Sequence, residues 1–218
     1  MIGLNWKIAN LDKDYVVSFD MFDTLIHRNM ALPEDLFKKI QKDIEESGEH
    51  EDFYKKRIEA EKRARGEGKK EEITLEDIYK AYNKGSLDIK LLKTIEIKNE
   101  ICSIFPDKKI HKIWEQCLRD GRKVIITTDM YLPRSVLVKI LEACGYNGYS
   151  KLYISSEWNA RKRTGCLFKR VMENEGTKVF HIGDNFKSDY IMPKANGLKA
   201  YWLPIPDIKR RILRIFRK

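Results

Sequence analysis

The stretch SFDMFDTLI, residues 18–26, closes an apolar run with two aspartates, Asp20 and Asp23. The run reads as a buried strand, and a carboxylate at its end is costly unless it is paired or coordinated. Ligands of open parallel sheets bind at the carboxyl ends of the strands. The two aspartates are therefore the first candidates for chemistry, provided that other strands of the same sheet end in the same way.

Further apolar runs, rich in β-branched residues and without polar alternation, resemble strands that are covered on both faces. With residues 15–20, they occupy residues 123–128, 151–155, 178–184 and 199–203. Helical patterns fill the gaps at 133–144, 166–174 and 187–195. The alternation predicts an α/β fold, a doubly wound parallel sheet of the Rossmann-like kind.

The interval between the first and second predicted strands contains only helical patterns and no convincing strand. Helices are expected at residues 33–48, 52–65, 74–85 and 87–105, and another at 107–119. Thr74 and Asp77 form a capping-box pattern at the start of the third of these. We therefore expect a core of residues 1–30 and 107–206, an inserted α-helical cap of residues 31–106, and a tail of residues 207–218.

The composition excludes several classes of protein. A chain of 218 residues that is 42% hydrophobic can bury a sizeable core, and no run approaches the roughly 18 apolar residues of a membrane span. The four cysteines show no CxxC spacing and no apolar signal segment precedes Tyr15, so a reduced, cytoplasmic setting is expected. The formal charge is +10, but acids and bases mix evenly in residues 34–65, and no nucleic-acid partner is expected.

The positive excess is concentrated in the tail, where residues 207–218 hold six Lys or Arg and one Asp. Its apolar residues recur at helical spacing: Ile208, Ile212, Ile215 and Phe216. A basic amphipathic helix can lie on an anionic membrane surface, here the inner face, or contact a protein partner. It can equally pack on the core of its own chain, and the three readings stay open.

Polar residues end three of the predicted strands. The first ends in Asp20, the second in Thr127-Thr128-Asp129, and the fourth in Asp184-Asn185 with Asp189 beyond. Neighbouring strands would bring the carboxylates of Asp20, Asp184 and Asp189 close together, and such a cluster needs a cation or raised pKa values. Mg²⁺ takes oxygen ligands and would leave positions free for a phosphate.

The order D-x-x-D-T-L, an apolar strand ending in Thr, a basic residue and GDxxxxD resembles the haloacid dehalogenase (HAD) superfamily of aspartate-nucleophile phosphotransferases. The stretches FDMFDTLI, TDMYLP, YISSE with KRTG, and HIGDNFKSD resemble more narrowly a bacterial branch of hydrolases found in surface-polysaccharide contexts. The resemblance covers the whole core. It implies an Mg²⁺-dependent phosphohydrolase or phosphotransferase that acts on a small phosphorylated metabolite through an aspartyl phosphate.

The resemblance also implies roles for individual residues. Asp20 would be the nucleophile. Thr128, or its neighbour Thr127, would donate a hydrogen bond to a phosphoryl oxygen, and Lys162 would neutralise the nucleophile and the phosphate. The competitors of Lys162 are the flanking arginines, Arg161 and Arg163.

The metal and substrate contacts follow in the same way. Mg²⁺ would be held by the carboxylates of Asp20, Asp184 and Asp189 and by the backbone carbonyl of Phe22. Asn185 and Arg28 are further candidates for contacts with phosphate or substrate. His27 follows the first motif beside Arg28 and could contact substrate as well. His181 reads as a hydrogen-bonded core histidine, and Asp129 as the cap of the turn before Pro133.

The sequence departs from the family pattern at Phe22, where phosphatases usually carry a second aspartate as general acid. Asp23 lies one residue later, and in an extended segment a shift of one residue turns a side chain to the opposite face. Asp23 either replaces the acid or caps the turn after the strand. A positioned acid contributes about 10²–10⁴ in rate. Its loss favours leaving groups that need no proton, such as anhydrides or aryl phosphates, or a substrate or cap residue that donates the proton. The alternatives are a scaffold that binds phosphate and Mg²⁺ without turnover and a 2-haloacid dehalogenase.

Overall fold

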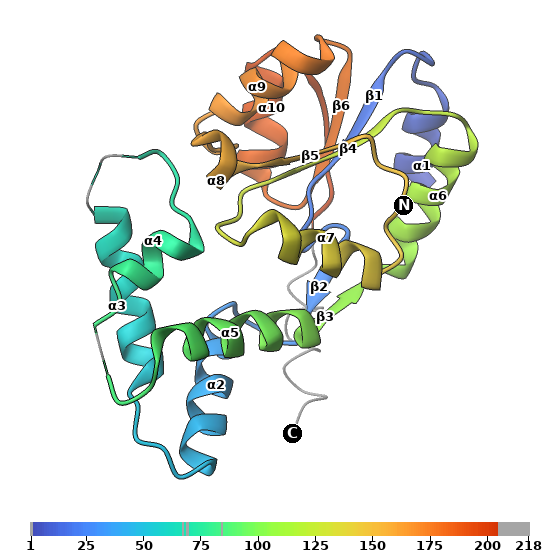
Figure 1. Ribbon diagram of the computed structural model, residues 1–218. Coiled ribbons are helices and arrows are strands. Elements are labelled where there is room, and N and C mark those ends of the chain that lie inside the picture. The colour runs from blue at the N-terminus through green and yellow to red at the C-terminus, as the bar shows by residue number, and fades with distance from the viewer. Residues whose placement is uncertain (1, 67, 69, 84, 205–218) are drawn as a thin grey trace.

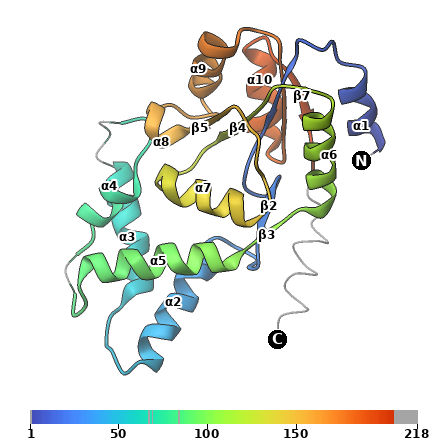
Figure 2. The same ribbon diagram turned by 45° about the vertical axis from the view of Figure 1, so that its right-hand side comes forward.

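The computed structural model describes residues 2–66, 68, 70–83 and 85–204. Within them, a central sheet has the strand order β5-β4-β1-β6-β7 (Figures 1 and 2). The strands are β1 (Val16–Phe19), β4 (Val124–Thr128), β5 (Lys151–Ile154), β6 (Val179–Gly183) and β7 (Lys199–Trp202). All neighbouring pairs are parallel, and β1 lies between β4 and β6. The predicted doubly wound α/β fold is confirmed.

Helices cover both faces of the sheet (Figure 2). One face packs on α1 (Ile2–Ala9), α6 (Lys108–Arg119) and α7 (Arg134–Ala143), and Val17 and Phe19 of β1 point to it. The other face packs on α9 (Cys166–Glu175) and α10 (Met192–Ala195), with Val16 on that side. Burial on both faces explains why the strands read as continuous apolar runs. Helix α1 was not predicted from the sequence.

A helical insert separates β1 from β4. It consists of α2 (Asp35–Glu46), α3 (Phe53–Gly66), α4 (Leu75–Lys80) and α5 (Ile89–Ser103). The expected capping box at Thr74 and Asp77 is present at the start of α4. The division into core, cap and tail stays a prediction.

The expectation of no strand in this interval was wrong. Residues Ile26–Arg28 (β2) and Ile104–Pro106 (β3) form an antiparallel ribbon where the chain enters and leaves the insert. Three-residue strands that pair across so long an interval leave no periodic pattern in the sequence. The helix expected at 87–105 ends at Ser103 for the same reason, since Ile104 already belongs to the ribbon.

The helix expected at 187–195 is also different in the structure. It begins as a π-helix, η1 (Phe186–Ile191), and continues as α10. Pro193 has no N–H to donate to the carbonyl of Asp189, which interrupts the ordinary α-helical ladder. Short π-helical turns occur frequently at functional sites. A further short helix, α8 (Ser155–Trp158), follows β5 directly.

The basic tail, residues 207–218, lies outside the described residues, so its three readings stay predictions. Among the residues that are described, none of the helices combines the length and the apolar character needed to cross a bilayer.

Candidate active site

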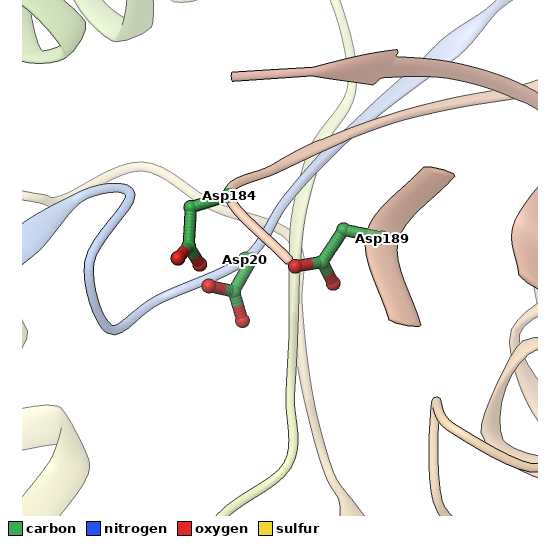
Figure 3. A group of neighbouring side chains, drawn as sticks. All are labelled: Asp20, Asp184 and Asp189. Atoms are coloured by element: carbon green, nitrogen blue, oxygen red, sulfur yellow. The ribbon is translucent and has the colours of Figure 1, made fainter. Parts of the chain in front are cut away.

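Three aspartates, one directly after β1 and two from the segment after β6, meet at the carboxyl edge of the sheet (Figure 3). Asp20 follows β1, Asp184 follows β6, and Asp189 belongs to η1. Each offers a carboxylate oxygen, and these oxygens all lie within 4.8 Å of one another. The backbone N–H of Asp20 donates to the carbonyl of Ile182 (2.8 Å), which fixes the end of β1 against β6. The predicted convergence of these acids is what the structure shows.

Glycine at position 183 lets Asp189 approach. A Cβ built on Gly183 would lie 2.4 Å from the Cγ of Asp189, which is closer than real Cβ contacts allow. The backbone N–H of Asn185 also donates to Oδ2 of Asp189 (2.9 Å). The GDN segment therefore holds the Asp189 carboxylate against the strand end.

Lys162 lies at the centre of the acids. Its Nζ is 2.5 Å from Oδ1 of Asp20 and 2.6 Å from Oδ1 of Asp189, and the residue is 4% exposed. The flanking arginines lie elsewhere: Arg161 pairs with Glu72 of the insert, and Arg163 is exposed. Of the three basic candidates, only Lys162 is in contact with the predicted nucleophile.

Burial and charge shift the pKa values of this cluster strongly. Burial, with the nearby carboxylates of Asp189 and Asp184, raises the pKa of Asp20 well above its usual range, although Lys162 opposes the shift. Burial alone would lower the pKa of Lys162, but the negative charges of Asp189 and Asp20 outweigh it and raise that pKa. The pKa of Asp189 is lowered, because Lys162 and His181 outweigh its burial.

The net charge of this cluster favours a divalent cation. Three carboxylates and one ammonium group have a net charge of two minus when all are ionised. Hard divalent ions such as Mg²⁺ prefer oxygen ligands of this kind and neutralise that charge. The donor set therefore fits Mg²⁺, with Asp20, Asp184 and Asp189 as the side chains that would hold it.

The two threonines at the end of β4 have different environments. Both are fully buried. The hydroxyl of Thr127 bonds the hydroxyl of Ser18 at 3.0 Å, whereas Oγ1 of Thr128 has no hydrogen-bond partner within the described part of the chain. Buried hydroxyls are normally satisfied, so an unpaired one at this edge needs an explanation. A phosphoryl oxygen bound at the site would supply the missing partner.

A buried polar chain runs beneath the aspartates. His181 of β6 is 2.8 Å from Oγ of Ser18 through Nδ1 and 3.1 Å from Oδ1 of Asp189 through Nε2. Burial lowers the pKa of His181, although Asp189 opposes the shift. The expectation of a hydrogen-bonded core histidine is confirmed, and the histidine also orients Asp189.

Asp23 has a turn conformation and its own ion pair. Its φ of 61° is left-handed, which Asp tolerates better than most residues. Its N–H donates to the carbonyl of Ile26 (2.7 Å), and its carboxylate lies 3.6 Å from Nδ1 of His27. Nε2 of His27 in turn lies 2.9 Å from Oδ2 of Asp107. Asp23 and His27 therefore form a structural group at the start of β2.

The remaining candidates are also engaged. Oδ1 of Asn185 accepts from the N–H groups of Lys187 and Ser188 and caps η1. Nε of Arg28 donates to Oε1 of Glu100 on α5 (2.8 Å), and its guanidinium carbon lies 4.2 Å from the centroid of the Phe22 ring.

The expectation that Asp129 caps the turn before Pro133 was wrong. Its Oδ1 accepts from the backbone N–H of Lys162 (2.8 Å), and α7 begins after its N-cap residue Pro133 with no side-chain cap. Asp129 thus holds the loop that carries Lys162. The sequence gives no signal for this contact, because it joins two loops that are adjacent only in the folded sheet.

Sequence reasoning assigned no role to Thr24 or Ser18. Oγ1 of Thr24 donates to Oδ2 of Asp20 (3.1 Å), and Ser18 links Thr127 to His181. Ser18 could have been noticed as the one polar residue within the apolar run YVVSF. Glu72 of the insert was also missed: it accepts from Ser155 and pairs with Arg161 beside Lys162.

Comparisons with known proteins give matches in structure alone. No family model and no curated protein matches the sequence significantly. The magnesium-bound HAD-hydrolase YfnB from Bacillus subtilis matches with a TM-score of 0.57 and 16% identity, covering 94% of this chain and 100% of that one. A HAD family enzyme from Bacteroides thetaiotaomicron, in complex with magnesium and inorganic phosphate, gives 0.55 and 17%, covering 86% and 93%.

A 2-haloacid dehalogenase from Pseudomonas syringae pv. Tomato matches with a TM-score of 0.61 and 14% identity, covering 86% of this chain and 85% of that one. This chain has the haloacid dehalogenase-like fold. The resemblance seen in the sequence motifs is thereby confirmed at the level of the HAD-like fold, and the narrower bacterial branch stays a prediction. Because HAD-like neighbours include both phosphatases and dehalogenases, the reaction has to be argued from the site.

Proposed function

We propose that this HAD-like chain is an Mg²⁺-dependent phosphohydrolase that acts on a small phosphorylated metabolite through an aspartyl phosphate. The observation that carries the proposal is the convergence of Asp20, Asp184 and Asp189, with Lys162 between two of them. A dehalogenase that needs no metal has little use for Asp184 and Asp189, which favours phosphate chemistry over carbon–halogen cleavage.

The residues divide the work as phosphoryl transfer requires, by positioning and by neutralising charge. A carboxylate oxygen of Asp20 attacks phosphorus, the bond from phosphorus to the leaving oxygen breaks, and its electron pair stays on that oxygen. Thr128 donates its hydroxyl, which has no partner in the described part of the chain, to a phosphoryl oxygen, and Lys162 neutralises the nucleophile and the phosphate.

Water completes the cycle. It attacks the phosphorus of the aspartyl phosphate, the bond from phosphorus to Asp20 breaks, and the carboxylate is regenerated. One proton of the water stays on the new phosphate oxygen and the other passes to the products or to solvent. Bound by the three aspartates and the backbone carbonyl of Phe22, Mg²⁺ would neutralise charge on the transferring group.

The helical insert supports a restriction to small substrates. Leu75 of α4 donates its N–H to the carbonyl of Tyr131, two residues after Asp129 (2.8 Å). Glu72 pairs with Arg161, the neighbour of Lys162. An insert held in this way would act as a cap that limits access to the site and excludes water.

A second function is favoured by one observation, the phenylalanine at position 22 in place of a general acid. A scaffold that binds phosphate and Mg²⁺ without turnover would need the same aspartates, lysine and threonine but no proton donor. Both functions therefore predict binding of phosphate and Mg²⁺, and only the phosphohydrolase predicts turnover of a substrate.

The test is phosphate release from p-nitrophenyl phosphate and a panel of phosphorylated metabolites, with and without Mg²⁺. The proposal predicts Mg²⁺-dependent release that is lost in Asp20→Asn. The matched control is Asp14→Asn, because Asp14 is an exposed aspartate that precedes β1 and pairs with Lys178. Retained Mg²⁺-dependent binding of a phosphate mimic without any turnover would support the scaffold. Halide release from a 2-haloacid without metal would support the dehalogenase.

A further inference from the structure

The ring of Phe22, the residue that stands where phosphatases of this fold usually carry a general acid, is covered by a cation. Phe22 stands two residues after Asp20, and its backbone bridges to Ile26 at the start of β2. The guanidinium carbon of Arg28, at the end of β2, lies 4.2 Å from the centroid of the Phe22 ring. Stacking of this kind is characteristic of arginine, whose planar cation binds an aromatic face.

A carboxylate fixes the other side of Arg28. Oε1 of Glu100 lies 2.8 Å from both Nε and Nη2 of Arg28, and the Glu100 side chain is 3% exposed. The ribbon adds a third constraint, because Arg28 pairs with Ile104 immediately after α5 ends. The orientation of Arg28 is thus set by Phe22, by Glu100 and by the β2–β3 register.

Arg28 still has donors to offer. Its contacts with Glu100 use Nε and Nη2, and its side chain is 14% exposed. Arginine presents several donors in a rigid fork and stays charged at any ordinary pH, so it binds phosphate well but does not give up a proton. An arginine beside position 22 therefore suits a leaving group that needs neutralisation of negative charge and no protonation.

We propose that Arg28 binds the leaving group during transfer to Asp20, that Glu100 is its positioning residue, and that the substrate class is phosphoanhydrides, in which the leaving group is itself a phosphate. The inference rests on the proposed phosphohydrolase function. It narrows the substrates of the proposed phosphohydrolase to phosphoanhydrides and excludes alkyl phosphate monoesters. A sugar or alcohol leaving as an alkoxide would need the acid that Phe22 replaces, whereas a phosphate leaves as a stable anion.

The step balances without a proton donor. A carboxylate oxygen of Asp20 forms a bond to the terminal phosphorus, and the bond from that phosphorus to the bridging oxygen breaks. The electron pair stays on the bridging oxygen, which departs as part of an anionic phosphate held by Arg28. Water then cleaves the aspartyl phosphate as in the general scheme, and its second proton passes to the phosphate products.

The experiment compares kcat/KM for three probes: ADP as a phosphoanhydride, glycerol 3-phosphate as an alkyl monoester, and p-nitrophenyl phosphate as an aryl ester with a good leaving group. The wild type should hydrolyse ADP at least about 100-fold better than glycerol 3-phosphate, which is the low end of what a general acid contributes. Arg28→Gln should reduce the ratio of ADP to p-nitrophenyl phosphate hydrolysis at least tenfold, and Arg28→Lys should restore part of it.

Glu100→Gln should move the same ratio in the same direction, mainly through KM for ADP. The control is Arg170→Gln, an exposed arginine on α9 that pairs with Glu173 and should leave the ratio unchanged. Equal losses on both substrates in folded Arg28→Gln and Arg28→Lys, or a wild type that prefers glycerol 3-phosphate, would overturn the inference while leaving the phosphohydrolase intact. A wild type that hydrolyses none of the probes would contradict both.

Discussion

At the scale of single residues, neighbouring threonines predict opposite effects of one substitution. Thr128 buries a hydroxyl without a partner among the described residues, which costs about 1–3 kcal/mol, whereas the hydroxyl of Thr127 is bonded to Ser18. Thr128→Val should therefore raise the melting temperature and lower kcat/KM roughly 10–100-fold, as loss of a hydrogen bond to a charged group does.

Thr127→Val is the matched control for that prediction. It leaves Ser18 without one of its partners, so the melting temperature should fall. Thermal denaturation of both variants, together with their steady-state kinetics, checks the pair. Equal destabilisation by the two substitutions would contradict the proposal that the Thr128 hydroxyl binds a phosphoryl oxygen.

The His27 group predicts a dependence of stability on pH. Burial alone would lower the pKa of His27, but the hydrogen bond to Asp107 and the contact with Asp23 raise it to about 9. Because the pKa is higher in the folded state, this stabilisation is complete below about pH 6.5 and is lost as the pH rises toward 9. The loss should amount to about 3 kcal/mol at most.

Denaturant unfolding between pH 6 and pH 10 measures this loss. The wild-type free energy of unfolding should decline over the interval, and His27→Gln should decline less. Parallel curves for the two proteins would show that His27 is not the titrating group.

The roles of some single residues could be predicted from the sequence, and the contacts of others could not. The strand ends predicted the convergence of Asp20, Asp184 and Asp189, and the family resemblance of the motifs implied the roles of Thr128 and Lys162. The partner of His27 was not visible, since Asp107 lies 80 residues away. The role of Asp129 was missed for a similar reason, because its partner is a backbone N–H on another loop.

At the scale of elements, the loop between α3 and α4 is tied to the loop that carries Lys162. Glu72 accepts from Ser155, pairs with Arg161, and donates its own N–H to Oδ1 of Asn159 (3.0 Å). Asp129 holds the same lysine loop from the core side. The position of Lys162 therefore depends on the insert as well as on the core.

Glu72→Ala tests this coupling. It should lower kcat about tenfold or more and speed hydrogen exchange in residues 155–165, with little change in Mg²⁺ affinity, because the three aspartates are untouched. Glu76→Ala is the control, since Glu76 is an exposed residue of α4 that pairs with Lys93. A drop in kcat of the same size in both variants would show that general loosening of the insert, and not the Glu72 contacts, is responsible.

Elements differed in how far they could be predicted. The sheet strands and the helices α6, α7 and α9 were clear from apolar periodicity and glycine stops. The ribbon of β2 and β3 and the π-helix η1 were not, because the first depends on a pairing across the whole insert and the second on a backbone register. These two elements adjoin the candidate site, where local patterns are least informative.

At the scale of the whole molecule, the cluster of like charge links metal binding to folding. A cation that binds only the folded chain stabilises it by about 2.7 kcal/mol at 100 times its Kd. Mg²⁺ should therefore raise the melting temperature of the wild type. Without Mg²⁺, Asp184→Asn should be more stable than the wild type, because it removes one of the three repelling carboxylates. With Mg²⁺, its melting temperature should rise much less than that of the wild type.

Differential scanning fluorimetry without metal, with Mg²⁺ and with Ca²⁺ measures the melting temperature of each protein and its increase on metal binding. An equal response to Mg²⁺ in Asp184→Asn and in the wild type would remove Asp184 from the metal site. The fold itself would be unaffected by that outcome, because the sheet is held by its apolar faces.

Detection of a covalent aspartyl phosphate tests most directly whether Asp20 is the nucleophile. The protein is mixed with Mg²⁺ and a turned-over phosphate ester, quenched rapidly in acid, and analysed by mass spectrometry of its peptides. If Asp20 is the nucleophile, a phosphoryl group is found on Asp20 that requires Mg²⁺, is absent in Asp20→Asn and persists in Asp14→Asn. Mg²⁺-dependent turnover with Asp20 unmodified, or turnover retained in Asp20→Asn, would contradict that role.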